Sequence, residues 1–212
     1  MADETIKSPL ATDRKYSEVD LDAGYQVERQ FQTAIVVDRY NLITDLSSSW
    51  DDVAAEGHAE KALARHKVIG KELDAFIASD STRMYIDSCL KLCRIKKQVL
   101  FRPYRCDSPT HKRYMELQLT PLADGAVEMK HFLLKEEPFP HPVNVNDVSA
   151  DMNRVNFQFT RCSMCNRLKK VGTEKWVAPE KLIPQQQAPV NVIHSVCPDC
   201  LNKLWQKRKT PL

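Results

Sequence analysis

Two Cys-x-x-Cys pairs near the C-terminal end of this sequence place the strongest constraint on how the chain can fold. The first pair is Cys162 and Cys165, and the second is Cys197 and Cys200. Each pair can present two sulfurs from one tight turn, so together they can complete a tetrahedral shell of four thiolates. The segment between the pairs has few large apolar residues, so its folding depends on a bound ion. The spacing therefore predicts a structural Zn²⁺ site.

Iron is the competing ion, because a shell of four thiolates suits both metals. Rubredoxin-like iron sites usually have glycine after the second cysteine of each pair, where the backbone is left-handed. Asn166 tolerates that conformation, but Leu201 does not and is typical of a helix start, which favours zinc. His194 is expected beside the shell or on the surface. A redox role is disfavoured because no thioredoxin-like context surrounds either pair.

The size and composition of the chain set its domain number and compartment. A chain of 212 residues has room for one ordinary domain and a smaller second one. No apolar run reaches the roughly 18 residues of a membrane span, and the polar, acidic N-terminus is unlike a secretory signal. We therefore expect a cytoplasmic protein without membrane contact. Disulfides are rare in that compartment, so Cys89, Cys93 and Cys106 are expected to be packing residues.

The apolar pattern before the cysteine pairs predicts two strands, then helices, then three strands. Two strands are expected within 33–46, and three more are expected at 98–106, 113–122 and 127–134. A helix from Asp80 to Cys93 is predicted between the two groups, with Asp80 as its cap and with Met84 and Leu90 facing the interior. Such segregated elements indicate an α+β fold, in which helices cover one side of an antiparallel sheet.

These elements divide the chain into four parts: a flexible N-terminus at 1–24, a domain at 25–135, a proline-containing linker at 136–160 and a zinc-binding module at 161–212. A short helix is expected at 23–31, outside the core of the domain. Its apolar residues would make an adhesive patch in water, so we expect this helix to help form a homodimer.

The same region carries an ordered set of short motifs: Ile35-Val36-Val37-Asp38, Trp50, Val68-Ile69-Gly70-Lys71-Glu72-Leu73, Phe76-Ile77, Phe101-Arg102-Pro103-Tyr104-Arg105-Cys106-Asp107 and Met115-Glu116-Leu117. This set resembles that of bacterial PAS sensory domains. The resemblance implies a five-stranded antiparallel sheet, with helices that enclose a cavity for ligand sensing or a surface for dimerisation. The cysteine module resembles one that follows some bacterial PAS domains.

Trp50 and Tyr85 are the candidate lining of a cavity for an unidentified small ligand, because flavins and aromatic ligands stack on such rings. Packing in the core is the alternative for both side chains. His58 and His66 are the candidate haem ligands, but each lies in a charged, alanine-rich stretch that is expected to be exposed. The Asn-Cys-Arg context of photochemical flavin-adduct domains is absent.

No catalytic motif or phosphate-binding glycine loop is present, so we expect a protein that is not an enzyme. The leading hypothesis is a sensory or protein-interaction PAS protein that acts on a signalling partner or on a second copy of itself. One alternative is a zinc-containing regulator that binds nucleic acid, and another is a flavin or haem redox sensor. The nucleic-acid alternative depends on basic residues near Trp176 and Trp205, namely Arg167, Lys169, Lys170, Lys203, Lys207, Arg208 and Lys209.

Overall fold

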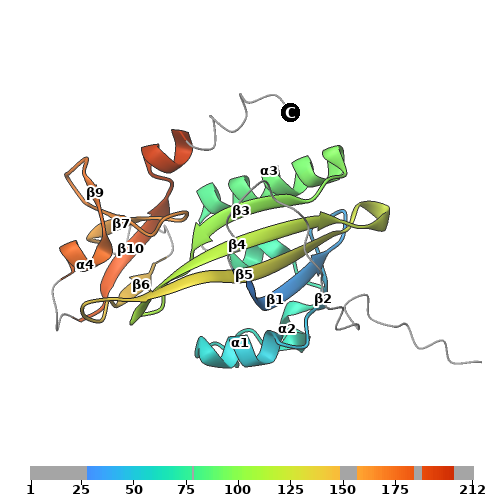
Figure 1. Cartoon of the computed structure of the whole chain (residues 1–212), viewed down its shortest axis with the longest axis horizontal. Coiled ribbons are helices and arrows are strands. Elements are labelled where there is room, and N and C mark those ends of the chain that lie inside the picture. The colour runs from blue at the N-terminus through green and yellow to red at the C-terminus, as the bar shows by residue number, and fades with distance from the viewer. Residues whose placement is uncertain (1–27, 78, 149–156, 184–187, 203–212) are drawn as a thin grey trace, which may run out of the picture.

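The computed structural model describes residues 28–77, 79–148, 157–183 and 188–202. These residues form two five-stranded sheets, and Figure 1 shows the second sheet beside one end of the long strands of the first. Within the described ranges, no helix combines the length and the apolar character needed to cross a membrane.

The first sheet is antiparallel and has the strand order β2-β1-β5-β4-β3. Its strands are β1 (Gln30–Val37), β2 (Ile43–Leu46), β3 (Leu100–Arg105), β4 (His111–Pro121) and β5 (Val127–Pro138). The turn η2 (Ala123–Gly125) joins β4 to β5. The prediction of an α+β fold with a five-stranded antiparallel sheet is thus confirmed, and β3 and β4 lie within two residues of their expected bounds.

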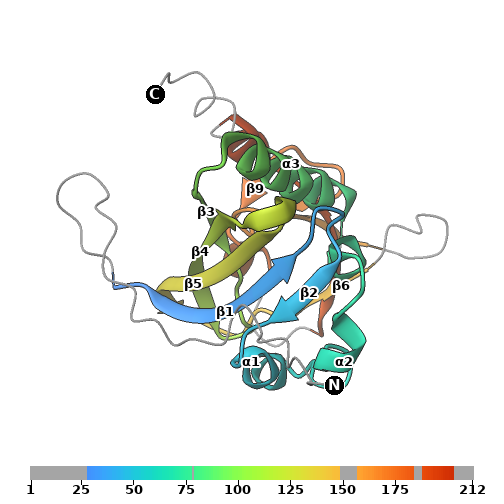
Figure 2. The same cartoon turned by 90° about the vertical axis from the view of Figure 1, so that its right-hand side faces the viewer.

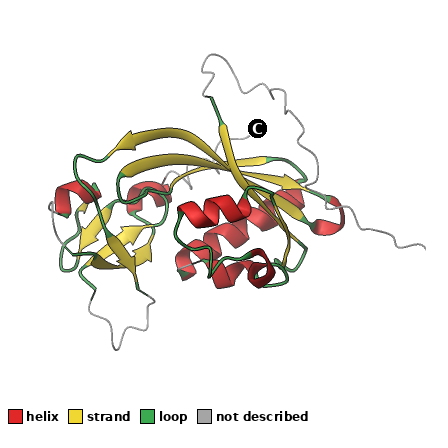
Figure 3. Cartoon of the chain, turned by 90° about the horizontal axis from the view of Figure 1, so that it is seen from below, coloured by secondary structure: helices red, strands yellow, loops and turns green. Residues whose placement is uncertain are grey.

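Four helices of the first unit lie between β2 and β3 in the chain. They are α1 (Trp50–Glu56), α2 (Arg65–Val68), η1 (Leu73–Phe76) and α3 (Asp80–Lys96). Figure 2 shows α2 and α3 on one side of the curved sheet, and Figure 3 shows helices gathered beneath the long strands. Val68 of α2 and Leu90 of α3 pack there in one core with Leu117 and Leu119 of β4, so this side is the inner face.

One side of α3 contributes to this core. Cys89, Leu90 and Cys93 are each at most 4% exposed, which confirms the predicted inward position of Leu90. The same prediction is wrong for Met84, which is 72% exposed. Met84 precedes Cys89 by five residues, so it lies about 140° around the helix from that buried side chain.

The N-cap of α3 is Ser79, so the expected cap at Asp80 is wrong by one residue. Ser79 has an extended backbone, and its hydroxyl accepts a hydrogen bond from the Thr82 amide at 3.2 Å. Serine and aspartate cap helices equally well, so composition alone does not distinguish the two positions. Asp80 is instead the first helical residue, where its negative charge interacts favourably with the helix dipole. Its carboxylate also forms an ion pair with the guanidinium of Arg83 at 2.9 Å.

The helix expected at 23–31 is wrong at its C-terminal end, and residues 23–27 lie outside the described part of the chain. Phe31 belongs to β1, where it pairs with Phe132 of β5. The two rings meet edge to face with centroids 5.9 Å apart, and Arg29 lies 4.3 Å from the Phe132 ring. Pairing with β5 decides the conformation here, because it satisfies backbone groups that a helix start would leave open.

The second sheet has the strand order β6-β10-β7-β8-β9, with β10 parallel to both β6 and β7. Its elements are β6 (Val145–Asp147), β7 (Phe159–Cys162), β8 (Leu168–Lys170), β9 (Trp176–Val177), α4 (Pro179–Leu182) and β10 (Val190–Ser195). A small core of its own lies against it, made of Phe139, Val143, Phe159, Leu168, Ile183, Val190 and Val192. This sheet has no counterpart in the elements expected from the sequence.

The segment expected as a linker takes part in both units where it is described. Strand β5 continues to Pro138, and β6 belongs to the second sheet. Phe139 and Val143 are buried in the second core, and their amides donate to the carbonyls of Thr110 and Pro109, each at 2.8 Å. Prolines lack the amide hydrogen but leave neighbouring residues free to bond, so this proline-containing segment is held against the β3–β4 turn.

A neutral histidine lies on the inner face of the first sheet. Nδ1 of His131 is 2.7 Å from the Tyr104 hydroxyl, and burial lowers the pKa of His131 to about 4. Burial also raises the pKa of Tyr104, so its hydroxyl keeps its proton and forms a hydrogen bond with the neutral imidazole. The folded chain therefore keeps His131 neutral at pH values where an unfolded chain would protonate it.

We expect acid to destabilise the first unit through His131. Between pH 6.5 and about 4 the unfolded state binds the extra proton, so stability present above pH 6.5 is lost as the pH falls. The loss approaches about 3 kcal/mol for a pKa difference of this size. Urea unfolding at pH 7 and pH 4.5 measures it, and His131→Asn should flatten the dependence. The exposed control His58→Asn should not, and equal slopes for all three proteins would contradict the assignment.

Candidate metal centre

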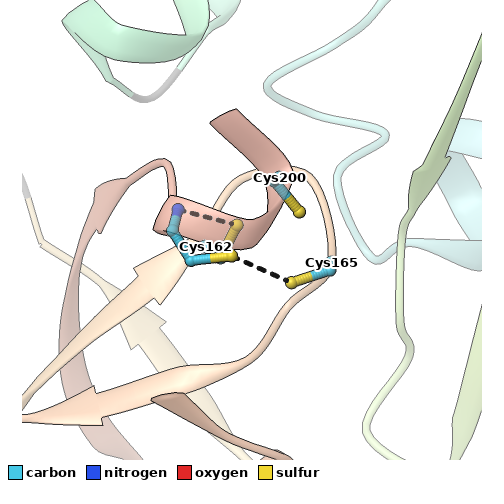
Figure 4. Close-up of side chains that lie close together, drawn as sticks. Cys162, Cys165 and Cys200 are labelled. Carbon is cyan, nitrogen blue, oxygen red and sulfur yellow. Dashed lines mark hydrogen bonds between the residues drawn. The ribbon is translucent and has the colours of Figure 1, made fainter. Parts of the chain in front are cut away.

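The first cysteine pair lies on the turn that joins β7 to β8. Cys162 ends β7, and its carbonyl accepts a hydrogen bond from the Asn166 amide at 2.9 Å. Asn166 has a left-handed backbone with φ of 58°, a conformation that asparagine tolerates better than most residues. The turn thereby directs the side chains of Cys162 and Cys165 to the same side (Figure 4).

The second pair follows β10 and is brought to the first by strand pairing. Strands β10 and β7 are parallel, and Ser195 lies opposite Cys162 in their register. Neighbouring parallel strands end at the same edge of a sheet, so Cys197 emerges beside Cys162. The chain then turns into a helix, in which the Leu201 amide donates to the Cys197 carbonyl at 3.0 Å. Leu201 thus lies in a helix, as predicted, but this helix begins three residues earlier, at Pro198.

The four sulfurs form a compact cluster. Every Sγ atom of Cys162, Cys165, Cys197 and Cys200 lies within 4.8 Å of the others, and the Sγ atoms of Cys165 and Cys197 are 3.8 Å apart. A tetrahedral shell with metal–sulfur bonds of about 2.3 Å requires sulfur–sulfur separations of about 3.8 Å. Cys162 and Cys197 are fully buried, and the other two are partly exposed. The cluster therefore fits one tetrahedral metal ion with no position left open for substrate.

Several donors point at the sulfurs of this cluster. The Cys197 amide donates to Cys162 Sγ at 3.4 Å, and Nε of Arg167 donates to Cys165 Sγ at 3.4 Å. Hydrogen bonding to the Cys162 thiol and then to Arg167 holds the pKa of Cys165 well below its usual range. The reciprocal bond with Cys165 raises the pKa of Cys162, and burial raises that of Cys200. Without metal, the latter two thiols are therefore protonated at neutral pH.

We expect metal binding to release protons, because a metal takes thiolates and not thiols. Cys162 and Cys200 must both lose a proton, so each unit of pH below neutrality should weaken zinc affinity by about tenfold for each of these two thiols, and therefore by at least about a hundredfold in all. Competition titrations against a chelator at pH 6, 7 and 8 measure the slope. An affinity that is independent of pH over this range would contradict the assignment of protonated thiols.

The metal centre is attached directly to the first unit. The Arg105 amide at the end of β3 donates to the Met164 carbonyl inside the first cysteine turn at 3.0 Å. The Thr82 hydroxyl of α3 donates to the Ser163 hydroxyl in the same turn at 2.6 Å. A third link joins Lys112 of β4 to Glu180 of α4 at 2.6 Å. The position of the cysteine turn is therefore sensitive to the ends of β3 and α3.

The remaining histidine and cysteines of interest lie outside the sulfur cluster. His194 contacts Asp147 at 2.8 Å, where it lowers the pKa of that carboxyl, and its Nδ1 is 3.5 Å from the Ser163 hydroxyl. It thus lies beside the first cysteine turn, as expected. Cys89 and Cys93 are buried packing residues, but Cys106 is exposed, so the packing prediction is wrong for Cys106. Cys106 directly follows the last residue of β3, and its amide donates to the Arg113 carbonyl of β4 at 3.0 Å.

Trp50 and Tyr85, the predicted cavity-lining residues, are both partly buried against the first core. The Trp50 indole donates to the Leu63 carbonyl at 2.7 Å, whereas the Tyr85 hydroxyl is buried beside Cys89. A cavity of about 210 Å³ lies elsewhere, between the β3–β4 turn and the second sheet. A ligand site at Trp50 and Tyr85 stays a prediction. His58 and His66 are exposed, as expected.

Two of the basic residues proposed for nucleic-acid binding have partners within the module. Arg167 contacts Cys165 and forms an ion pair with Asp199 at 2.8 Å. Lys169 lies 3.8 Å from Glu174 and 5.8 Å from the Trp176 ring. Lys203, Lys207, Arg208 and Lys209 lie outside the described residues. Arg167 and Lys169 are therefore engaged in contacts within the chain, whereas Lys170 is exposed.

Comparisons of the chain with models of protein families, with curated proteins and with solved structures found no match in any of the three. We therefore infer the function of the site from its own geometry and chemistry.

Proposed function

We propose that this chain is a non-enzymatic sensory protein with a PAS-like domain and a structural zinc site, and that it acts by changing its contacts with a protein partner. The observation that carries the zinc assignment is the mutual approach of four cysteine sulfurs within 4.8 Å. Zinc is favoured over iron because Cys200 lies on a helical turn, where Leu201 lacks the left-handed backbone of an iron-binding loop.

The PAS-like part of the proposal is supported by the arrangement of the first unit. Two strands, a group of helices and three further strands follow in the order that the resemblance implies, and the sheet is antiparallel with five strands. The helices α2 and α3 pack over its inner face. Direct hydrogen bonds from β3 and α3 to the cysteine turn supply a route by which a change in the first unit would reach the second.

Native mass spectrometry of the purified chain tests metal, small ligand and assembly together. We expect a mass that includes one zinc ion per chain, which a chelator removes after acidification. A mass equal to that of the polypeptide alone, with four freely titratable thiols under native conditions, would rule out the metal site. A retained organic cofactor would instead support the flavin or haem alternative, and elemental analysis distinguishes zinc from iron.

The proposed partner is a second copy of the chain or another signalling protein. Phe31 at the start of β1 is 44% exposed, so part of the ring remains open to contact with another surface. Sedimentation at several concentrations, with Phe31→Ser as the variant, measures self-association. A monomer that binds DNA with strong salt dependence would favour the nucleic-acid alternative.

A further inference from the structure

Arg167 occupies a central position at the metal centre. It follows the left-handed Asn166 and directly precedes β8, and its carbonyl accepts a hydrogen bond from the Cys162 amide at 2.8 Å. Its backbone is therefore part of the first cysteine turn. Because the turn fixes the backbone of Arg167, its side chain extends from a defined position beside the sulfurs.

The guanidinium of Arg167 bridges the two cysteine pairs. Nε donates to Cys165 Sγ at 3.4 Å, and one terminal nitrogen lies 3.8 Å from Cys197 Sγ. The other terminal nitrogen pairs with the Asp199 carboxylate at 2.8 Å. Asp199 lies between Cys197 and Cys200 in the chain, so the carboxylate anchors the guanidinium to the second pair. One side chain thus contacts both halves of the site.

The negative charge of the site makes the contact with Arg167 important for the reactivity of the sulfurs. Four thiolates around a divalent ion leave about two negative charges, which make the sulfurs nucleophilic. Charge-assisted hydrogen bonds from a guanidinium withdraw electron density from the sulfurs that accept them. Cys165 and Cys197 receive this contact. In the described part of the chain, Cys200 has no N–H donor at hydrogen-bond distance, and it is partly exposed.

We propose that Arg167 is a positioning residue that ties the two cysteine pairs together and protects the Cys165 and Cys197 thiolates, which leaves Cys200 as the thiolate that electrophiles attack first. This inference rests on the proposed metal site. In the attack, the Cys200 sulfur forms a bond to the electrophilic carbon and expels its leaving group. The resulting thioether no longer holds the metal as a thiolate does, so modification opens the site at its C-terminal helix.

The test uses the full chain loaded with zinc and treated with limiting iodoacetamide, which alkylates a sulfur and releases iodide. Mass spectrometry identifies the cysteine modified first, and a chromogenic chelator reports the rate of zinc release. We expect Cys200 to react first in the unaltered protein. Arg167→Met should accelerate zinc release by about tenfold or more and make Cys165 reactive as well, in line with the usual effect of losing a group that supports metal ligands.

Two further variants separate this role from general effects of charge and folding. Arg167→Lys keeps the charge but loses the planar fork, so we expect a release rate between those of the unaltered protein and Arg167→Met. Lys169→Met removes one positive charge two residues away and should leave both readouts unchanged.

Several outcomes would overturn the inference. They are modification of Cys165 before Cys200 in the unaltered protein, equal release rates for all three variants, or equal acceleration by Lys169→Met. If the unaltered protein holds no metal, the proposed zinc site fails together with this inference. A metal-loaded protein that is insensitive to Arg167 overturns the inference alone.

Discussion

Replacing Cys162 by serine should abolish stoichiometric zinc binding and unfold the second sheet while the first sheet remains folded. Cys162 is fully buried at the end of β7, so a serine there leaves three thiolates and a hydroxyl that binds zinc poorly. Structural zinc sites of this kind contribute about 10 to 16 kcal/mol of apparent binding energy at neutral pH. A core of seven buried residues, beside a sheet whose strands are only two to six residues long, does not replace that contribution.

Hydrogen exchange followed by mass spectrometry checks this prediction region by region. Residues 157–183 and 188–202 should lose protection in Cys162→Ser, whereas β4 and β5 should keep theirs. Cys106→Ser is the matched control, because Cys106 is exposed and lies outside the sulfur cluster. The prediction is wrong if the second sheet stays protected without metal, or if both sheets unfold together.

Replacing Leu90 by alanine should destabilise the first unit by about 2 to 5 kcal/mol, the usual cost of emptying a leucine site in a core. Leu90 is fully buried on α3 and packs with the residues of β4 and β5 that line the inner face. Met84→Ala on the same helix should change stability by no more than about 0.5 kcal/mol, because that side chain is 72% exposed.

Denaturant unfolding of both variants, monitored by a signal from the first unit, measures the difference. Leu90 and Met84 lie six positions apart on one helix and have similar helix propensity, so a difference between the two variants reports the difference in burial. A large effect of Met84→Ala would show that this surface is covered in solution, for example by a second copy of the chain. A small effect of Leu90→Ala would contradict the core assignment.

Hydrogen bonds connect the cysteine cluster to the first unit. Arg105 and Thr82 bond to the turn that carries Cys162 and Cys165, so the position of that turn is linked to the ends of β3 and α3. Arg167 closes the other side of the site, against Cys197. Cys200 lies outside these contacts with Arg167 and is partly exposed, as Cys165 is.

Two features were predictable from sequence because they depend on local pattern. Cys-x-x-Cys spacing places two sulfurs on one turn whatever the surrounding fold, so the four cysteines of the cluster were identified before any tertiary information. Alternation along β4, where Met115, Leu117 and Leu119 are buried, marks an antiparallel sheet with one covered face. The order of strands and helices then indicated the α+β class.

Other features depended on contacts between distant segments. Phe31 is in a strand because β5 lies beside it, and Phe139 and Val143 are buried because the β3–β4 turn accepts their amides. A pattern of prolines predicts the absence of regular structure, but it carries no information about which surface the segment meets. The face of α3 that holds Met84 is exposed because the sheet covers the other face.

Of the two sulfur contacts of Arg167, only one could be predicted from the sequence. An arginine two residues after a cysteine pair is a candidate donor to the nearer sulfur, and this signal was available in the sequence. Its reach to Cys197 depends on the parallel pairing of β10 with β7, which places Ser195 opposite Cys162. The sequence by itself determined which four cysteines could form the cluster, since their spacing acts over a single turn. Only the tertiary structure decided how the two pairs meet and which sulfurs Arg167 contacts, because strand pairing and side-chain reach act between segments about thirty residues apart.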